Sequence, residues 1–232
     1  MIVHSKCAQV NGATRMMGLL GESISHTLSP AIHNHSAALL NINAVYLPLG
    51  MPARQVEAFL KVSWEMGAIG FNVTTPHKAL VASLVPEHSL ASVNTLYRGD
   101  SWWKAASTDG EGFKRGLARM GVILDESLAI TFLGAGGAVT AILQYMVESW
   151  RKGHLKSLPE ITIHARRLDG QKALKSFWPR DVPLRFTTLD VEALKSTFDR
   201  NGQSLLVQAT SAPIRGDDMS NLLPAFDKFC GP

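Results

Sequence analysis

The chain has 232 residues with 46% hydrophobic and 18% charged content, which predicts a globular protein of one large domain or two small ones. No run reaches the roughly 18 apolar residues of a membrane span, and residues 1–15 lack the apolar stretch of a signal peptide, so we expect a cytoplasmic protein without a membrane partner. The formal net charge of +4 is scattered, and Cys7 and Cys230 lack metal-type spacing, so nucleic acid, disulfides and a metal site are not expected.

The first half of the chain alternates short apolar segments with amphipathic ones. Strands are predicted at 16–20, 44–49 and 68–73, with helices after Pro30 and over 53–66. This order is typical of βαβ units and a mostly parallel sheet. Two adjacent strands, 93–97 and 102–106, then surround Arg98-Gly99-Asp100, a pattern that favours a hairpin.

A helix over 110–120, with Phe113, Leu117 and Met120 on one face, leads into a second unit. We place the domain boundary between residues 106 and 107. The second unit has predicted strands at 128–133, 160–164, 184–188 and 204–209 and predicted helices at 139–150, 171–177 and 191–198. This order of elements is that of a Rossmann-type domain, so the sequence predicts an α/β protein.

The strand at 128–133 is followed directly by a glycine turn, Gly134-Ala135-Gly136-Gly137-Ala138. Backbone amides of such a turn approach a pyrophosphate closely, and the N-terminus of the next helix favours its negative charge. Val139 stands where the full fingerprint has Gly or Ala, and glycines also form tight turns without a ligand. On this motif alone, a dinucleotide site and an ordinary turn both remain open.

Two arginines, Arg166 and Arg167, follow the second strand of this unit, and no carboxylate precedes Asp169. A carboxylate at this place binds the ribose hydroxyls of NAD, whereas arginine accommodates the additional phosphate of NADP. The sequence therefore favours NADP. The alternative is a pair of solvated surface arginines.

Polar side chains cluster at two places in the first unit. Hydroxyls alternate in Ser25-His26-Thr27-Leu28-Ser29-Pro30, a spacing that can hold a carboxylate or a polyol; the alternative is that Ser29 caps the helix that Pro30 opens. The segment Asn72-Val73-Thr74-Thr75-Pro76-His77-Lys78 ends a buried-looking strand. The carboxyl end of a strand is where ligands of α/β proteins usually bind.

Lys78 is a candidate acid or base. A free lysine is protonated at neutral pH, so this role needs a site that lowers its pKa or couples it to a carboxylate. Asp109, in Ser107-Thr108-Asp109-Gly110, supplies such a carboxylate. The alternatives are a surface lysine and a helix-capping aspartate, and Asn94, a polar residue in an apolar strand, has either a structural or a substrate-binding role.

Together and in this order, these motifs resemble the shikimate dehydrogenase family over nearly the whole chain. The segments that carry the resemblance are 25–30, 72–78, 93–96, 107–112, 134–138 and 208–211. The resemblance implies a substrate-binding domain (1–106) followed by a Rossmann-type NADP-binding domain (107–232). It also implies the interconversion of shikimate and 3-dehydroshikimate with NADP, in chorismate and aromatic amino acid biosynthesis.

The resemblance assigns roles to single residues. Lys78 and Asp109 match the catalytic pair, which accepts the hydroxyl proton while a hydride passes to the nicotinamide. The residues that match substrate-binding positions are Thr27, Ser29, Thr74 and Asn94, with Asn72 supporting the same pocket. The residues that match cofactor-binding positions are Gly134, Ala135, Gly136, Gly137, Ala138 and Arg166, with Arg167 next to it and with Ala209 and Thr210 beside the nicotinamide half.

The chain departs from the family pattern at several positions. Thr27 replaces a serine, Ser107 and Gln208 replace asparagines, and Ala165-Arg166-Arg167 replaces Asn-Arg-Thr. Segment 79–92 is short for the family, and the chain stops before a further strand and closing helices. The motifs leave open a quinate or aminoshikimate dehydrogenase and a non-catalytic NADP-binding relative, as a monomer or a homodimer.

Overall fold

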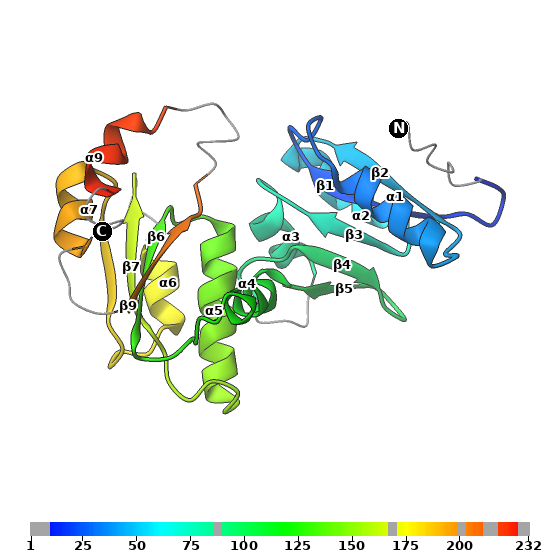
Figure 1. Ribbon diagram of the computed structural model, residues 1–232. Coiled ribbons are helices and arrows are strands. Elements are labelled where there is room, and N and C mark those ends of the chain that lie inside the picture. The colour runs from blue at the N-terminus through cyan, green and yellow to red at the C-terminus, as the bar shows by residue number, and fades with distance from the viewer. Residues whose placement is uncertain (1–9, 86–89, 167–170, 199–202, 211–217, 227–232) are drawn as a thin grey trace. The chain divides into compact units, whose positions relative to one another are not determined.

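The computed structural model describes residues 10–85, 90–166, 171–198, 203–210 and 218–226 (Figure 1). Cys7, Arg167, Ser211 and Cys230 lie outside these ranges. The chain divides into two compact units, Met1–Thr108 and Asp109–Pro232, and each is described by itself. The boundary expected from the sequence lies two residues earlier. Among the described residues, no helix is both long and apolar enough to span a membrane.

The first unit contains a five-stranded sheet in the order β2-β1-β3-β4-β5. Its strands are β1 (Arg15–Gly21), β2 (Ala44–Gly50), β3 (Gly70–Val73), β4 (Thr95–Arg98) and β5 (Trp103–Ala106). β1 pairs in parallel with β2 and β3, as the alternation of elements predicts, whereas β3, β4 and β5 are antiparallel. The β4–β5 hairpin forms at the expected place, and the N–H of Gly99 donates to the carbonyl of Trp102 at 3.2 Å.

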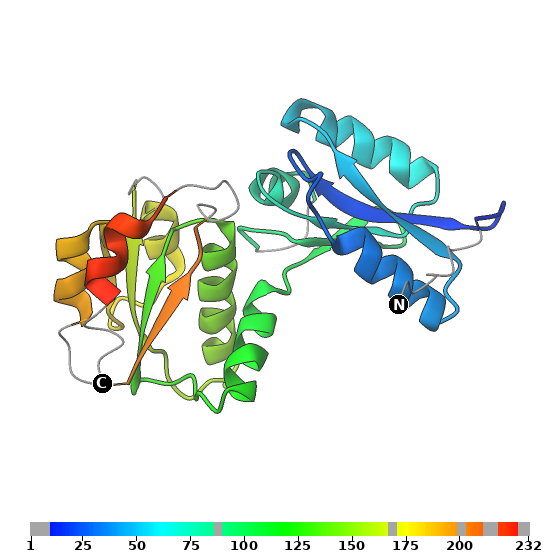
Figure 2. The same ribbon diagram turned by 45° about the horizontal axis from the view of Figure 1, so that its top comes forward.

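Helices lie on both faces of this sheet (Figure 2). One face packs against α1 (Ser29–Leu39), and the other against α2 (Ala53–Glu65) and α3 (Lys78–Leu84). The α2 and α3 side holds the main core, whose buried members include Leu20, Leu60, Phe71, Val81 and Trp103. The α1 side holds the smaller cluster of Leu19, Ile24 and Tyr46, and Asn72 of β3, on this face, is half-buried.

The second unit contains a four-stranded parallel sheet in the order β8-β7-β6-β9. Its strands are β6 (Leu128–Leu133), β7 (Glu160–Ala165), β8 (Leu184–Thr188) and β9 (Gln203–Gln208). One face is covered by α4 (Asp109–Arg119), α5 (Gly137–Arg151) and α6 (Gln171–Phe177), and the other by α7 (Val191–Phe198), η1 (Ser220–Leu222) and α9 (Leu223–Phe226) (Figures 1 and 2). This strand order is that of a Rossmann sheet, so the predicted fold class is confirmed.

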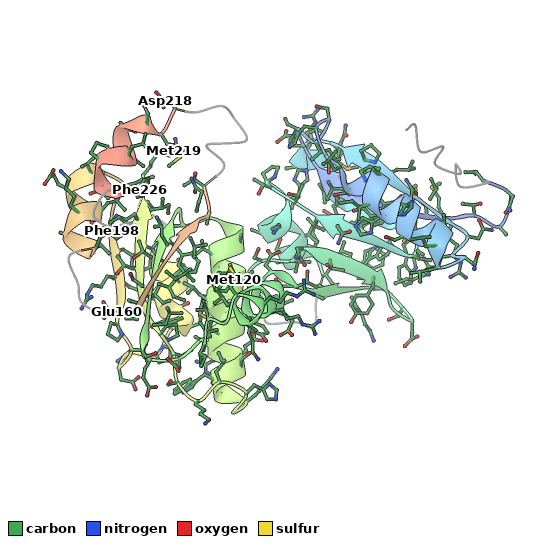
Figure 3. The ribbon with its side chains drawn as sticks, viewed as in Figure 1. Met120, Glu160, Phe198, Asp218, Met219 and Phe226 are labelled. Atoms are coloured by element: carbon green, nitrogen blue, oxygen red, sulfur yellow. The ribbon has the colours of Figure 1, made fainter. Side chains whose placement is uncertain are left out.

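Met120 departs from its predicted place. Leu117 is buried and Phe113 packs against the core, as their spacing predicts, but Met120 is 67% exposed. The helix ends at Arg119, and Met120 lies in the turn that leads to Gly121, which has a φ of +73°. The prediction of a third apolar residue on this face was wrong because the helical period no longer applies there (Figure 3).

Candidate active site

Two of the predicted substrate-binding residues lie at the carboxyl end of β3. The N–H of Thr74 donates to the carbonyl of Leu20 at 2.9 Å, and the N–H of Val73 donates to the carbonyl of Asn94 at 2.8 Å. Asn72 lies two residues before Thr74, and all three predicted residues are half-buried. The pairing of β3 with β4 therefore brings Asn72 and Thr74 close to Asn94, the residue before β4.

The turn after β3 is held in place by a buried histidine that the sequence analysis did not single out. His77 is fully buried, and its Nε2 lies 2.8 Å from the carbonyl oxygen of Met51, which can only accept a proton. The N–H of His77 donates to the carbonyl of Thr74 at 2.9 Å, and the Thr75–Pro76 peptide bond is cis. His77 thus fixes Thr74 and the half-buried Lys78, the first residue of α3, at one edge of the sheet.

The amide of Asn94 is bonded to the end of the first unit. Its Oδ1 accepts from the N–H of Thr108 at 3.0 Å and from the hydroxyl of Thr95 at 3.0 Å, and its Nδ2 donates to the hydroxyl of Thr108 at 2.9 Å. These bonds give Asn94 a structural role beside its predicted role in substrate binding. Asp109, the first residue of α4, follows directly on Thr108.

Ser107 stands where the family has asparagine. Its hydroxyl oxygen is buried and has no hydrogen-bond partner within the described part of the chain. The substitution therefore does not supply a second anchor beside Thr108.

A chain of hydroxyl groups connects α1 with β3. The hydroxyl of Thr27 donates to that of Ser29 at 3.1 Å, and the N–H of Ser29 donates to the Thr27 hydroxyl at 3.2 Å. The Ser29 hydroxyl is bonded to the phenol of Tyr46, which donates to Oδ1 of Asn72 at 2.8 Å. The alternative that Ser29 caps α1 is wrong, because the N-cap residue is Leu28 and no side chain caps the helix.

Tyr46 is the member of this chain of hydroxyls that sequence reasoning missed. An aromatic residue within an apolar strand is normally part of the core, and Tyr46 is indeed only 3% exposed. No residue spacing in the sequence connects it with Ser29 or Asn72, since the three come from different elements.

The glycine turn holds Gly134 in a backbone conformation that favours glycine. Gly134 has a φ of +108°, and a Cβ atom there would lie 3.0 Å from the carbonyl oxygen of Ala209. Around Gly136, by contrast, no heavy atom lies within 4 Å of the place of a Cβ. Val139 is fully buried in the core, so it packs the helix against the sheet at the fingerprint's last position.

The N-terminus of α5 keeps its amide donors for a ligand. No side chain caps it, and its first turn contains no acidic residue. Gly137 and Ala138 are its first residues, and Ala135 packs against the core beneath the turn. An anionic group such as a pyrophosphate fits here, because the first N–H groups of a helix have no acceptor within the helix and lie at the positive end of its dipole.

A hollow of about 140 Å³ lies at the carboxyl ends of β7 and β9. It is lined by Arg166, Leu189, Thr210, Asp218, Met219, Asn221 and Leu222. Figure 3 shows Asp218 and Met219 at the end of the unit opposite Glu160, the first residue of β7. The structure therefore brings the predicted residues Arg166 and Thr210 to one surface, and it adds Asp218 and Met219, which the sequence gave no reason to choose.

Side chains of the hollow are held by local hydrogen bonds. The N–H of Thr210 donates to Oε1 of Gln208 at 2.7 Å, and Nε2 of Gln208 donates to the Met219 sulfur at 3.3 Å. Bonds from the backbone and hydroxyl of Ser220 lower the pKa of Asp218. Gln208, where the family has asparagine, thus orients both Thr210 and Met219.

Comparison with known proteins decides the family. The family model of the shikimate dehydrogenase substrate binding domain matches residues 19–95. The shikimate dehydrogenase (NADP(+)) of Thermosynechococcus vestitus is 31% identical over 174 residues, which cover 67% of this chain and 60% of the relative. That of Rubrobacter xylanophilus is 39% identical over 140 residues, which cover 58% of this chain and 49% of the relative. The chain belongs to the shikimate dehydrogenase family.

The solved structures agree with this membership. The shikimate 5-dehydrogenase of Listeria monocytogenes, in complex with shikimate and NAD, superposes with a TM-score of 0.76 at 26% identity, over 95% of this chain and 76% of that one. The shikimate dehydrogenase of Mycobacterium tuberculosis, with a TM-score of 0.70 at 24% identity over 90% of this chain and 75% of that one, shows the same fold. The chain spans 60% and 61% of the first two curated relatives that it matches.

The region that matches the family model contains several of the site side chains described above. The matched residues 19–95 include all four members of the hydroxyl chain, Thr27, Ser29, Tyr46 and Asn72, as well as Thr74 and Lys78. The curated relatives are NADP(+) enzymes, and NADP is the cofactor that the arginine after β7 predicted. Among the described residues, no group of three or more His, Cys, Asp or Glu side chains is placed to hold a metal ion.

Proposed function

We propose that this protein interconverts shikimate and 3-dehydroshikimate with NADP as the cofactor. The observation that carries the proposal is the set of polar side chains within the region that matches the substrate binding domain, at the carboxyl ends of β1 and β3. The glycine turn and Arg166 in the second unit support the cofactor part. We further propose that the protein acts in the cytoplasm, as a monomer or a homodimer.

Hydroxyl and amide groups are suited to the substrate proposed. A cyclic acid with several hydroxyl groups needs donors for its carboxylate and both donors and acceptors for its hydroxyls. Thr27 and Ser29 supply hydroxyl groups beside α1, and Asn72 and Thr74 supply an amide and a hydroxyl from β3 and the turn after it. We assign the carboxylate to Thr27 and Ser29 and the ring hydroxyls to Asn72, Thr74 and Asn94.

Lys78 and Asp109 are assigned to proton transfer. Oxidation of a secondary alcohol breaks its C–H bond, whose hydride leaves with both electrons, and its O–H bond, whose proton needs an acceptor. The N–H of Val93 donates to the carbonyl of Lys78 at 3.2 Å, and Asp109 follows Thr108, which binds Asn94. Val93 thus holds the backbone at Lys78, and Asn94 holds that of Thr108, the residue before Asp109.

The residues of the second unit fit NADP. When bound, NADP⁺ supplies the hydride acceptor of the forward reaction. Gly134, Gly136 and the N-terminus of α5 are assigned to the pyrophosphate, and Arg166 to the 2′-phosphate. Arg167 is proposed as a second arginine at this phosphate.

Thr210 and Ala209 follow β9, and we assign both to the nicotinamide half of the cofactor, as the resemblance implies. Thr210 also lines the hollow of about 140 Å³ that contains Arg166.

The test is an assay of the full chain with shikimate and NADP⁺, followed by the absorbance of NADPH. We expect turnover with shikimate, and parallel assays with quinate and an aminated analogue decide between the near alternatives. NADP⁺ binding without turnover of any of the three would contradict the enzymatic function and leave a nucleotide-binding relative.

A further inference from the structure

One side chain on β2 holds the beginning of α1. The ring of Tyr46 stacks on that of His33, with centroids 4.2 Å apart and an interplanar angle of 10°. The N–H of Tyr46 donates to Oδ1 of Asn34 at 2.8 Å, and Nδ2 of Asn34 donates to the carbonyl of Tyr46 at 3.0 Å. With the bond between its phenol and Ser29, Tyr46 contacts three residues on one face of α1.

The same side chain reaches across β1 to β3. Tyr46 is paired with Met17, and Asn72 with Leu19, so the side chains of Tyr46 and Asn72 lie on the same face of the sheet with β1 between them. The phenol nevertheless donates to Oδ1 of Asn72 at 2.8 Å. Tyr46 is therefore the direct connection between the helix that carries Ser29 and the strand that carries Asn72.

Proton counting gives this chain of hydroxyls one direction. Each hydroxyl has a single hydrogen to donate. Without substrate, Thr27 gives its hydrogen to Ser29 and the Tyr46 phenol gives its hydrogen to Asn72, so the contact between Ser29 and the phenol uses the Ser29 hydrogen. A bound carboxylate takes the hydrogens of Thr27 and Ser29 instead, and the bond from Tyr46 to Asn72 stays the same. Burial raises the pKa of Tyr46 to about 12, so the phenol keeps its hydrogen at neutral pH.

The bond from Tyr46 also decides which way the Asn72 amide faces. An asparagine amide has an oxygen that accepts and an NH₂ group that donates, and a half-turn about its last bond exchanges them. The phenol donates to Oδ1 of Asn72 at 2.8 Å, so the oxygen of the amide faces Tyr46. The NH₂ group is then left on the other side of the amide as a donor.

We propose that Tyr46 is a positioning residue that holds the Asn72 amide with its NH₂ group available to a ring hydroxyl of the substrate. The inference rests on the proposed function for the identity of the substrate. Without the phenol, the amide loses the bond that fixes its orientation, and its oxygen and NH₂ group exchange places. The site then no longer favours a substrate whose ring hydroxyl accepts a hydrogen bond from the Asn72 NH₂ group over a substrate that lacks this hydroxyl.

The experiment is Tyr46→Phe in the full chain, with Tyr97→Phe as the matched control. Phenylalanine keeps the stack on His33 and both backbone bonds to Asn34, so it removes the hydroxyl alone. Tyr97, on β4 of the same unit, is 47% exposed, which makes it a tyrosine outside the chain of hydroxyls. We expect KM for shikimate to rise about tenfold in Tyr46→Phe, as for one lost hydrogen bond to an oriented group. We also expect kcat to change less than about threefold and KM for NADP⁺ to stay the same.

Analogues of shikimate that lack one non-reacting ring hydroxyl sharpen the kinetic test. We expect the preference for shikimate over one such analogue to fall in Tyr46→Phe and to stay as in wild type in Tyr97→Phe. An unchanged preference and KM would overturn the proposal. Equal losses in kcat and in binding of both ligands, together with a lower Tm, would overturn it in favour of a structural role.

A measurement without substrate separates this proposal from the proposed function. The side-chain amide of Asn72, assigned by ¹⁵N NMR, should shift or broaden in Tyr46→Phe and not in Tyr97→Phe. If it does so while wild type fails to turn over shikimate, the proposed function is wrong and the positioning role stands. If the amide signals of Tyr46→Phe match those of wild type, the positioning role is wrong whatever the activity.

Discussion

The carbonyl oxygen of His164 accepts the N–H of Gly134 at 2.7 Å, which joins the end of β7 to the glycine turn after β6. The ring of His164 is fully buried and extends this connection. Its Nδ1 lies 3.1 Å from the carbonyl of Thr188, and its Nε2 lies 3.1 Å from the hydroxyl of Thr197. His164 therefore connects the glycine turn to β8 and α7.

Stability should depend on pH through His164. Burial lowers the pKa of His164 below its ordinary value, against a smaller opposite effect of the Thr188 carbonyl and Asp190. As the pH falls, His164 therefore binds a proton more readily in the unfolded state than in the folded state. The contribution of the neutral His164 ring to the free energy of unfolding is complete above about pH 6.5 and is lost as the pH falls below that value. Urea unfolding from pH 7.5 to 5 should show falling stability in wild type and a shallower fall in His164→Gln. His154→Gln, which replaces an exposed histidine, is the control. Equal slopes of unfolding free energy against pH in all three proteins would refute the role of His164.

Substitution by alanine should have different effects at two glycines of the glycine turn. Gly134→Ala places a Cβ 3.0 Å from the Ala209 carbonyl at a φ of +108°, so it should cost about 1–3 kcal/mol of unfolding free energy. Gly136→Ala meets open space at a φ of −81°, so it should leave the Tm unchanged but weaken NADP⁺ binding by filling the phosphate site. Thermal unfolding and titration with NADP⁺ check both, and Gly136→Ala with full cofactor affinity would contradict the assignment.

Gly110 allows α4 and α5 to pack closely. A Cβ at Gly110 would lie 2.1 Å from Cβ of Tyr145, which cannot move away without its backbone. Gly110→Ala should therefore destabilise the protein by about 3 kcal/mol or more, at the upper end of overpacking costs. Gly112→Ala, in the same helix with open space around it, should stabilise by about 0.5–1 kcal/mol. Denaturant midpoints that are the same for the two variants would disprove the close packing.

Lys78→Ala should lower kcat on the order of 10²-fold or more, because a proton-transfer group is lost, and should leave NADP⁺ binding nearly unchanged. Lys61→Ala is the matched control, since Lys61 is an exposed lysine on α2 that pairs with Glu57 at 2.7 Å. Steady-state kinetics and a cofactor titration measure the two quantities. Equal losses of both in Lys78→Ala would indicate a structural role instead.

Arg166→Ala should weaken NADP⁺ by about 10- to 100-fold, as for the loss of a charge-assisted bond to a phosphate, and should weaken NAD⁺ much less. The double variant with Arg167→Ala tests whether the neighbouring arginine adds to the effect. Arg119→Ala, an exposed arginine at the end of α4, controls for net charge. The ratio of kcat/KM for the two cofactors is the readout, and an unchanged ratio would remove Arg166 from the 2′-phosphate.

The element order, the hairpin and the Rossmann topology followed from the sequence, because alternating apolar periods and glycine turns are local properties. The ends of elements were less predictable. Met120 continues the apolar period of α4 and yet lies in the following turn, since a helix stops where its backbone bonds stop. The hydroxyls of Thr27 and Ser29 were also visible in the sequence, but their bonding direction was not.

By itself, the sequence determined the fold class, the family and the residue types at the site, because each rests on a short motif whose parts are neighbours in the chain. Only the tertiary structure decided that Tyr46 joins Ser29 to Asn72, that His164 holds Gly134, and that Arg166 shares a hollow with Thr210 and Asp218. These relationships connect residues from different strands and helices. They depend on strand register and close packing, which no local pattern specifies.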